Sequence, residues 1–225
     1  MTASAVVQAT RLALGRVGAF LPEWPHDPTP ADAQREACRR LESLGFRSVW
    51  TNELIGKDCF AQLGVLLAAT ERMVFGTCIA NMWARPAQTA HGAATVLSEA
   101  YPGRLVLGLG VGYPQQAEAV GRDFARPVET MRGYLTAMDA AAGDTPASYA
   151  RILGANRPRM LQLAAAMTEG ALPAGSTPTD TATTRTVLGP DKLLVVYLDA
   201  GPDLGTPTRS PRQSGHTSTL ERTTS

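Results

Sequence analysis

Apolar positions along the chain change their spacing many times between residues 16 and 198. Short apolar runs, typical of buried strands, alternate with longer stretches in which apolar residues recur every three or four positions, as on one face of a helix. The spacing predicts strands at 16–21, 48–52, 73–80, 104–112, 151–155, 170–173 and 193–198. Helical stretches separate most of these strands, and the first contains Ala33, Ala37, Leu41 and Leu44.

Residues that favour helix ends mark the boundaries of these stretches. Thr29 can cap a helix whose first position is Pro30, and the Asp32 carboxylate follows three residues after the cap. Gly45 stands where a helix commonly ends in a left-handed conformation. Residues 177–180 repeat the Thr-Pro-x-Asp signature. The threonines that follow have low helix propensity, so we expect a poor helix there.

Strands alternating with helices predict parallel βαβ units, and therefore a doubly wound sheet or a barrel. The pattern covers roughly 200 residues, at the lower edge of the size of a closed barrel, and no eighth strand–helix unit is recognisable. We expect an α/β fold of the TIM-barrel type, (β/α)8 but incomplete, with about seven strands, over residues 15–199. Residues 1–14 are expected to be an N-terminal extension. In 200–225, 16 of 26 residues are Gly, Pro, Ser or Thr, which predicts a disordered tail.

Charge and cysteine content limit the classes of partner. The 21 Lys and Arg residues nearly cancel the 20 Asp and Glu residues, which argues against nucleic-acid binding and against a polybasic membrane patch. No apolar run approaches the roughly 18 residues of a membrane span, and 1–14 lack a signal-peptide core. Cys38, Cys59 and Cys78 form neither an even set nor a CxxC pair, so we expect no disulfide and no metal site. A cytoplasmic protein is the expectation.

Polar and aromatic residues follow the predicted strands, at the edge where barrel enzymes bind ligands. They are Glu23, Trp24, His26, Asn52, Glu53, Asn81, Met82, Trp83, Tyr113, Asn156 and Arg157. Two tryptophans, a tyrosine and several amides would suit a flat aromatic ligand with polar edges. The alternative is that long loops carry such residues without any ligand.

Three glycines, Gly108, Gly110 and Gly112, recur at every second position and therefore share one face of a strand. Either a planar ligand or another part of the backbone packs against that face, or the glycines serve the tight bends of a barrel. A dinucleotide fingerprint needs GxGxxG between a strand and its helix, whereas this segment has GLGVG followed by Tyr113 and Pro114. We therefore reject a Rossmann site.

The turn at 154–159 has the composition of an anion site. Gly154 ends a predicted strand, Asn156 can cap the next helix, and Arg157 and Arg159 flank Pro158 in its first turn. Open backbone N–H groups and the helix dipole at such a turn attract anions, and guanidinium groups would strengthen the attraction. The alternative is an ordinary capped helix with solvated arginines.

Histidines offer few catalytic candidates. His91 lies among alanines in a predicted helix, where a packing role is more common than a catalytic one, and His216 lies in the predicted tail. His26 follows the first strand and is the one histidine at the expected ligand edge.

Several segments carry a family resemblance in combination. They are LGFRSVWTNE at 44–53, AATERMVFGTCIAN at 68–81 and PGRLVLGLGVG at 102–112, with MRGYL at 131–135 and PRML at 158–161 following in order. Together they resemble the luciferase-like monooxygenase superfamily, and within it the actinobacterial oxidoreductases that use coenzyme F420. The resemblance covers residues 16–198. Family members continue through an eighth strand, so this chain resembles a C-terminally truncated or divergent member.

The resemblance implies a (β/α)8 barrel with a cofactor site. Gly76, Thr77, Cys78 and Ile79 would form a bulge behind the cofactor ring, with a non-prolyl cis peptide at Cys78–Ile79. Asn52, Glu53, Asn81, Gly110 and Gly112 would lie near the ring. The turn of Gly154, Ala155, Asn156, Arg157 and Arg159 would hold the cofactor phosphate.

Hydride transfer between coenzyme F420 and a small organic substrate is the implied chemistry, with FMN less favoured and oxygen use left open. His26 or Glu53 would be the proton donor, and a homodimer is one expected assembly. Two alternatives remain open. One is an inactive barrel fragment that acts through self-association or a partner, and the other is an unrelated phosphate-handling barrel enzyme.

Overall fold

The computed structural model describes residues 3–21, 29–144 and 147–198, and its sheet is parallel throughout. The strands are β1 (Ala19–Leu21), β2 (Ser48–Thr51), β3 (Val74–Thr77), β4 (Ala80–Asn81), β5 (Leu105–Gly110), β6 (Ala150–Leu153), β7 (Gly170–Ala171) and β8 (Leu193–Leu194). Their order is β1-β2-β3-β5-β6-β7-β8, and β4 pairs with β5 beyond the end of β3. Since β3 and β4 occupy one position, the sheet has the expected seven positions.

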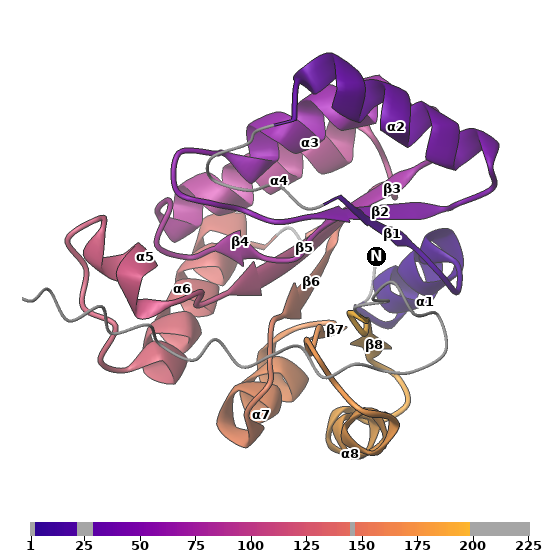
Figure 1. Ribbon diagram of the computed structural model, residues 1–225. Coiled ribbons are helices and arrows are strands. Elements are labelled where there is room, and N and C mark those ends of the chain that lie inside the picture. The colour runs from indigo at the N-terminus through magenta and orange to yellow at the C-terminus, as the bar shows by residue number, and fades with distance from the viewer. Residues whose placement is uncertain (1–2, 22–28, 145–146, 199–225) are drawn as a thin grey trace, which may run out of the picture.

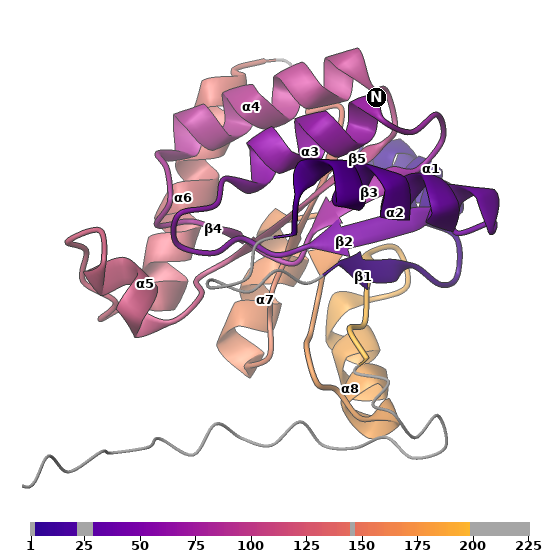
Figure 2. The ribbon, with the colours of Figure 1, turned by 45° about the horizontal axis from the view of Figure 1, so that its top comes forward.

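Helices follow the strands and lie outside the curved sheet (Figures 1 and 2). They are α2 (Ala31–Ser43), α3 (Cys59–Ala68), α4 (Ala87–Ala100), α5 (Pro114–Glu118), α6 (Pro127–Ala142), α7 (Pro158–Met167) and α8 (Pro178–Leu188). None of the helices in the described part of the chain is long and apolar enough to cross a membrane.

Alternate residues of each strand face opposite sides of the sheet. Val49, Phe75 and Leu107 belong to the apolar cluster on the helix-covered side, whereas Trp50 and Val106 belong to a second cluster on the concave side. Burial on both faces explains why the strands were nearly continuous apolar runs in the sequence.

The first residues of the chain also belong to this core. Helix α1 (Ala3–Leu14) places Val6, Val7 and Leu14 in the concave cluster. The Arg11 guanidinium donates to the carbonyl oxygens of Pro190 and Lys192, at 3.0 and 3.1 Å. The segment expected as an extension is therefore a helix that packs on the concave face. The domain boundary at residue 15 stays a prediction.

The sheet does not close into a complete barrel within the described residues. No ladder joins β8 to β1, and the two edges meet through an edge-to-face contact of Phe20 and Tyr197, whose ring centroids lie 5.0 Å apart. An incomplete barrel with seven strand positions confirms the expected fold class.

Local structure differs from the expectations in several places. The strands expected at 170–173 and 193–198 form only over Gly170–Ala171 and Leu193–Leu194. The predicted strand 73–80 is interrupted after Thr77, and the predicted poor helix forms as α8 over Pro178–Leu188. Its threonines are compensated by a capping box, because the Thr177 hydroxyl accepts from the Asp180 N–H while the Asp180 carboxylate accepts from the Thr177 N–H. The expected tail, 200–225, lies outside the described residues.

Candidate functional site

The site centres on the interruption between β3 and β4. The Cys78–Ile79 peptide bond is cis, as expected. The Cys78 N–H donates to the Thr51 carbonyl at 2.7 Å, and the Thr77 hydroxyl donates to the Gly108 carbonyl at 2.7 Å. These bonds fix the bulge, residues 76–79, to both neighbouring strands.

Glycines make room for the bulge. A Cβ at Gly108 would collide with the Thr77 carbonyl oxygen, and a Cβ at Gly110 would lie 2.7 Å from the Ile79 side chain. Gly76 has a different neighbour, because the Trp50 indole occupies the space of its missing Cβ. The repeated glycines of β5 therefore accommodate another part of the chain, as one of the sequence-based interpretations holds.

The bulge and the turn after β6 lie side by side. A Cβ at Gly154 would lie 3.0 Å from the Ile79 Cγ2 atom, and the Gly154 N–H donates to the Leu109 carbonyl at 2.8 Å. Ile79 thus packs between Gly110 and Gly154. The two segments assigned to cofactor ring and phosphate occur at the same end of the sheet.

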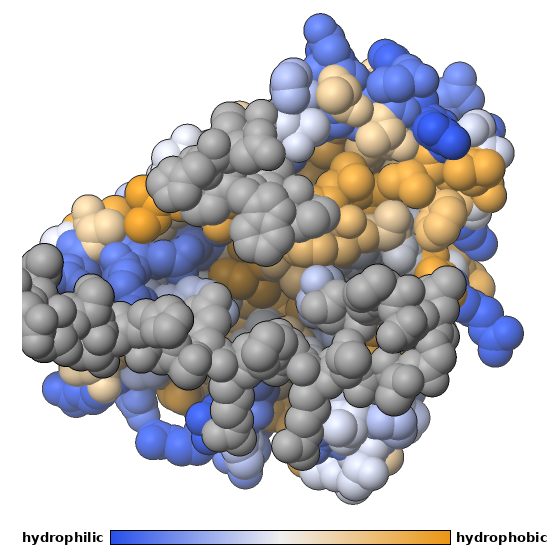
Figure 3. Space-filling view, in the orientation of Figure 1, coloured by the Kyte–Doolittle hydropathy of each residue, from blue (hydrophilic) through white to orange (hydrophobic). Residues whose placement is uncertain are grey.

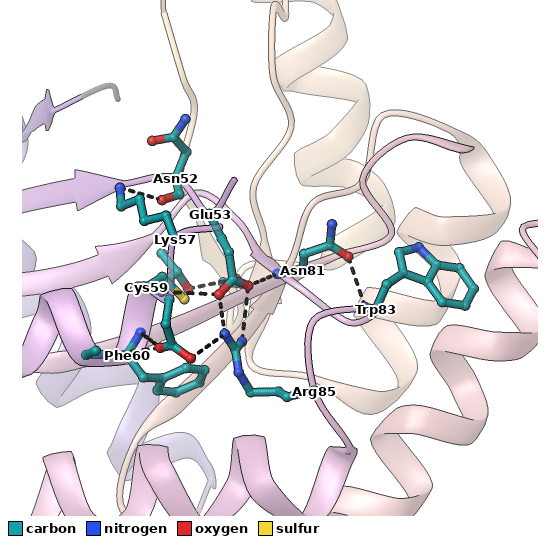
Figure 4. A network of polar contacts seen from close by, with 12 residues as sticks. Asn52, Glu53, Lys57, Cys59, Phe60, Asn81, Trp83 and Arg85 are labelled. Atoms are coloured by element: carbon teal, nitrogen blue, oxygen red, sulfur yellow. Dashed lines mark hydrogen bonds and ion pairs between the residues drawn. The ribbon is translucent and has the colours of Figure 1, made fainter. Parts of the chain in front are cut away.

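Glu53 is the most enclosed charged side chain near the bulge (Figure 4), and its side chain is only 1% exposed. One carboxylate oxygen accepts from the Cys59 N–H at 3.2 Å, and the other accepts from the Asn81 N–H at 2.7 Å. Arg85 donates to both oxygens. A carboxylate with this many donors is held as an acceptor, so the geometry favours a positioning role over proton donation.

Arg85 is the partner that the sequence did not reveal. Its side chain is 9% exposed, it lies over the Phe60 ring at 4.8 Å, and it also contacts Asp58 at 3.1 Å. Burial would lower the pKa of the Arg85 guanidinium, but the hydrogen bond and charge of Glu53 raise that pKa above its ordinary value. Arg85 follows closely after Asn81, Met82 and Trp83, which were expected at the ligand edge. A basic residue at that place was the sequence signal that could have identified it.

Asn81 connects Glu53 to the rim. Its backbone N–H donates to Glu53, and its side-chain oxygen accepts from the Trp83 N–H at 3.0 Å (Figure 4). The Asn81 amide nitrogen lies 2.9 Å from the position of a Cβ on Gly112, whose φ is +56°. Asn52 points away from Glu53, and its carbonyl accepts from Lys57. The structure thus groups Asn81 and Gly112 with Glu53.

The turn at 154–159 keeps its helix N-terminus open. Asn156, expected as a cap, instead accepts from the Ala174 N–H at 2.9 Å, and Arg157 is the N-cap residue without a side-chain cap. Arg159 pairs with Glu129 on α6 at 2.6 Å, while Ala155 is buried. No contact of the exposed Arg157 side chain is seen among the described residues. Among the described residues, no side chain caps the first-turn N–H groups of α7, and the Arg157 side chain lies beside them in sequence.

The remaining sequence candidates are histidines, a cysteine and possible metal ligands. His26 lies outside the described residues, as do Glu23 and Trp24. His91 bonds the Tyr149 hydroxyl at 3.0 Å, in agreement with a packing role. Burial raises the pKa of the half-buried Cys78 thiol to about 11, so it is not a thiolate nucleophile at neutral pH. No group of three or more metal-ligating side chains occurs in the described ranges.

Comparison with known proteins finds relatives of this chain. The 5,10-methylenetetrahydromethanopterin reductase of Methanolobus tindarius is 30% identical over 180 residues, which are 69% of this chain and 53% of that protein. The chain thus spans about half the length of this curated relative.

Two solved structures show the same fold. The coenzyme F420-dependent tetrahydromethanopterin reductase of Methanopyrus kandleri has a TM-score of 0.66 and 16% identity, over 82% of this chain and 66% of that chain. The oxygenating constituent of 3,6-diketocamphane monooxygenase from Pseudomonas putida, in complex with FMN, has a TM-score of 0.64 and 15% identity, over 77% of this chain and 61% of that chain. Residues 16–186 match the family model itself, and the chain belongs to the luciferase-like monooxygenase family.

Proposed function

We propose that this protein is an oxidoreductase that binds coenzyme F420 and transfers hydride between it and a small organic substrate. The observation that carries the proposal is the packing of Ile79 between Gly110 and Gly154, which joins the bulge to the anion-binding turn. Similarity to the Methanolobus reductase and to the F420-dependent reductase of Methanopyrus supports this cofactor. FMN is the second choice, supported by the monooxygenase complex.

The residues at the turn fit the charged end of such a cofactor. Helix α7 has no side-chain cap, and the exposed Arg157 is its N-cap residue, at the positive end of the helix dipole. An uncapped N-terminus with an available guanidinium is suited to phosphate, whereas Arg159 is already paired with Glu129.

The protein itself would position the cofactor ring and shield it from water. When bound, a deazaflavin accepts or donates a hydride at its ring. The bulge would support that ring, and the Glu53–Arg85 pair would hold the bulge in place through the Asn81 N–H. We assign Glu53 as a positioning residue, and His26 remains the proposed proton donor. Whether oxygen takes part depends on loops around the substrate.

Titration of the full chain with F420 and with FMN tests the proposal. We expect F420 to bind in the micromolar range and the Arg157→Gln variant to weaken it about tenfold, because a charge-assisted contact to phosphate is lost. The Arg40→Gln variant on exposed α2 removes the same charge far from the turn and should bind like the wild type. Failure of both cofactors to bind at high micromolar concentration would reject the enzyme.

An inactive barrel fragment is the second candidate, and one observation favours it. Among the described residues, β1 and β8 each have a free edge, which could pair with a partner or a second copy. The free edges predict concentration-dependent association in sedimentation velocity and no cofactor binding. A monomer that unfolds cooperatively in calorimetry and binds F420 would eliminate this candidate.

A further inference from the structure

A cavity of about 640 Å³ lies in the open side of the sheet, between β1 and β8. Its wall is mainly apolar and includes Leu14, Phe20, Trp50, Leu172 and Leu193. Figure 3 shows apolar residues gathered below the polar residues at the top of the view. The volume is in the range of sites for small organic ligands.

Three arginines line the same cavity: Arg11, Arg16 and Arg185. The Lys192 carbonyl oxygen accepts from Arg185 at 2.8 Å and from Arg11 at 3.1 Å, so two guanidinium groups converge on one atom. Burial lowers the pKa of Arg185, and the nearby charge of Arg11 lowers it further. Within the described residues, no Asp or Glu lines the cavity or pairs with these arginines.

The converging arginines keep donors available. Arg11 uses Nη2 for the Pro190 and Lys192 carbonyls, and Arg185 uses Nη1 for the Gly189 and Lys192 carbonyls. A guanidinium has five N–H donors, so the other terminal nitrogen and Nε of each group have no partner in the described part of the chain. Two like charges without a counter-ion are stabilised by an anion that bridges them.

The arginine end of the cavity is separate from the proposed cofactor turn, whereas Cys78 of the bulge lines its other end. Arg11 and Arg16 precede β1 and Arg185 precedes β8, so the arginines lie near the amino ends of the parallel strands, whereas Gly154 follows β6 at the carboxyl ends. A further strand could not enter here without displacing the Phe20–Tyr197 contact and the bonds of Arg11. A small ligand requires neither displacement.

We propose that this cavity binds an amphipathic anion, with an apolar body against Trp50 and Leu172 and a single carboxylate or phosphate head on Arg11 and Arg185. The proposal does not depend on F420 binding.

Decanoate, decyl phosphate, decanol and acetate are suitable probes, with tryptophan fluorescence and thermal unfolding of the full chain as readouts. We expect decanoate or decyl phosphate to bind, decanol to bind at least tenfold more weakly, and acetate not to bind, because both the apolar body and the charged head contribute. The stronger of the two anions identifies the head group. Bound ligand should also slow the alkylation of Cys78, which lines the cavity, while Cys38 and Cys59 have no exposed surface.

Substitutions of the three arginines test where the anionic head group binds. Arg11→Gln and Arg185→Gln should each weaken the anion about tenfold and leave decanol unchanged. Because both arginines also bond the backbone, Arg16→Glu is the safer variant: its side chain has no hydrogen bond among the described residues, and it should weaken the anion several-fold. Arg40→Gln should bind like the wild type. Equal affinity for decanoate and decanol, or anion binding that none of the three variants changes, would overturn the proposal.

Discussion

At the scale of single residues, the site depends on glycines, because a side chain at their positions would collide with the bulge. Gly108, Gly110 and Gly154 leave space that the bulge fills with its own carbonyl oxygen and with Ile79. A pattern of glycines in a sequence does not say whether a ligand or the chain itself fills that space. The answer depends on the segment that packs against the glycines, which here is the bulge and lies far from them in sequence.

Gly108→Ala should therefore destabilise the protein strongly. Its Cβ would collide with the backbone oxygen of Thr77, which cannot move without breaking the bulge. We expect a loss of several kcal/mol in the free energy of unfolding, measured by urea denaturation. Gly133→Ala is the matched control, because nothing lies within 4 Å of its Cβ position in helix α6 and alanine should stabilise by about 0.5–1 kcal/mol. Similar effects of the two changes on stability would show that the close approach of Gly108 to the Thr77 oxygen does not exclude a side chain there.

Arg85→Met should also be costly, since it leaves the Glu53 carboxylate buried without its cation. The expected loss in the free energy of unfolding is about 3–5 kcal/mol. Removing the partner of an exposed pair, in Arg35→Met, should cost less than about 1 kcal/mol, because Asp32 remains solvated. If equilibrium denaturation gives equal values for the two variants, Glu53 does not depend on Arg85.

At the scale of elements, helix α1 makes the largest contribution to the core that the sequence did not predict. It buries Val6, Val7 and Leu14 in one cluster with residues of β3, β5, β6 and β8. Its own pattern is short and weakly apolar, so nothing in residues 1–14 identified what they would cover.

Substitutions on opposite faces of α1 test its role. Val7→Asp should lower the free energy of unfolding by several kcal/mol, because Val7 is 3% exposed and an unpaired carboxylate would enter the concave cluster. Leu12 is 72% exposed, and Leu12→Asp should change stability by less than about 0.5 kcal/mol. Chemical denaturation of both variants is the measurement. A similar small effect for both would mean that α1 does not contribute to the core.

The strands and most helices followed from local patterns, whereas the site followed only in part. Apolar period and capping residues predicted β2, β5, β6 and α7, because these signals can be read from a short stretch of sequence. The resemblance supplied the cis bond at Cys78. Arg85 was missed because its partner, Glu53, lies 32 positions away. Asn156 was predicted as a cap, but the loop after β7 uses its side chain through Ala174.

At the scale of the whole molecule, no ladder crosses the open side of the sheet within residues 3–21, 29–144 and 147–198. Phe20 from β1 and Tyr197 after β8 make an edge-to-face pair across it (centroid distance 5.0 Å). In the described part of the chain, an aromatic pair rather than a ladder therefore links the two edges of the seven strand positions.

A double-mutant cycle can measure this connection. Phe20→Leu and Tyr197→Leu, singly and together, should give a coupling free energy of about 0.5–1.5 kcal/mol in urea denaturation. A parallel cycle with Phe20→Leu and Val96→Ala, where Val96 is exposed on α4, should give a coupling near zero. A zero value in the first cycle would mean that the two edges are independent.

The position of α1 has a consequence for synthesis. Its arginine reaches a carbonyl 181 positions later in the chain, and at roughly 5–20 residues per second a ribosome needs on the order of ten seconds to make that stretch. The arginine of α1 therefore leaves the ribosome well before the carbonyl that it binds. Contacts of such long sequence separation form slowly, so we expect the Arg11 bonds to form late in folding.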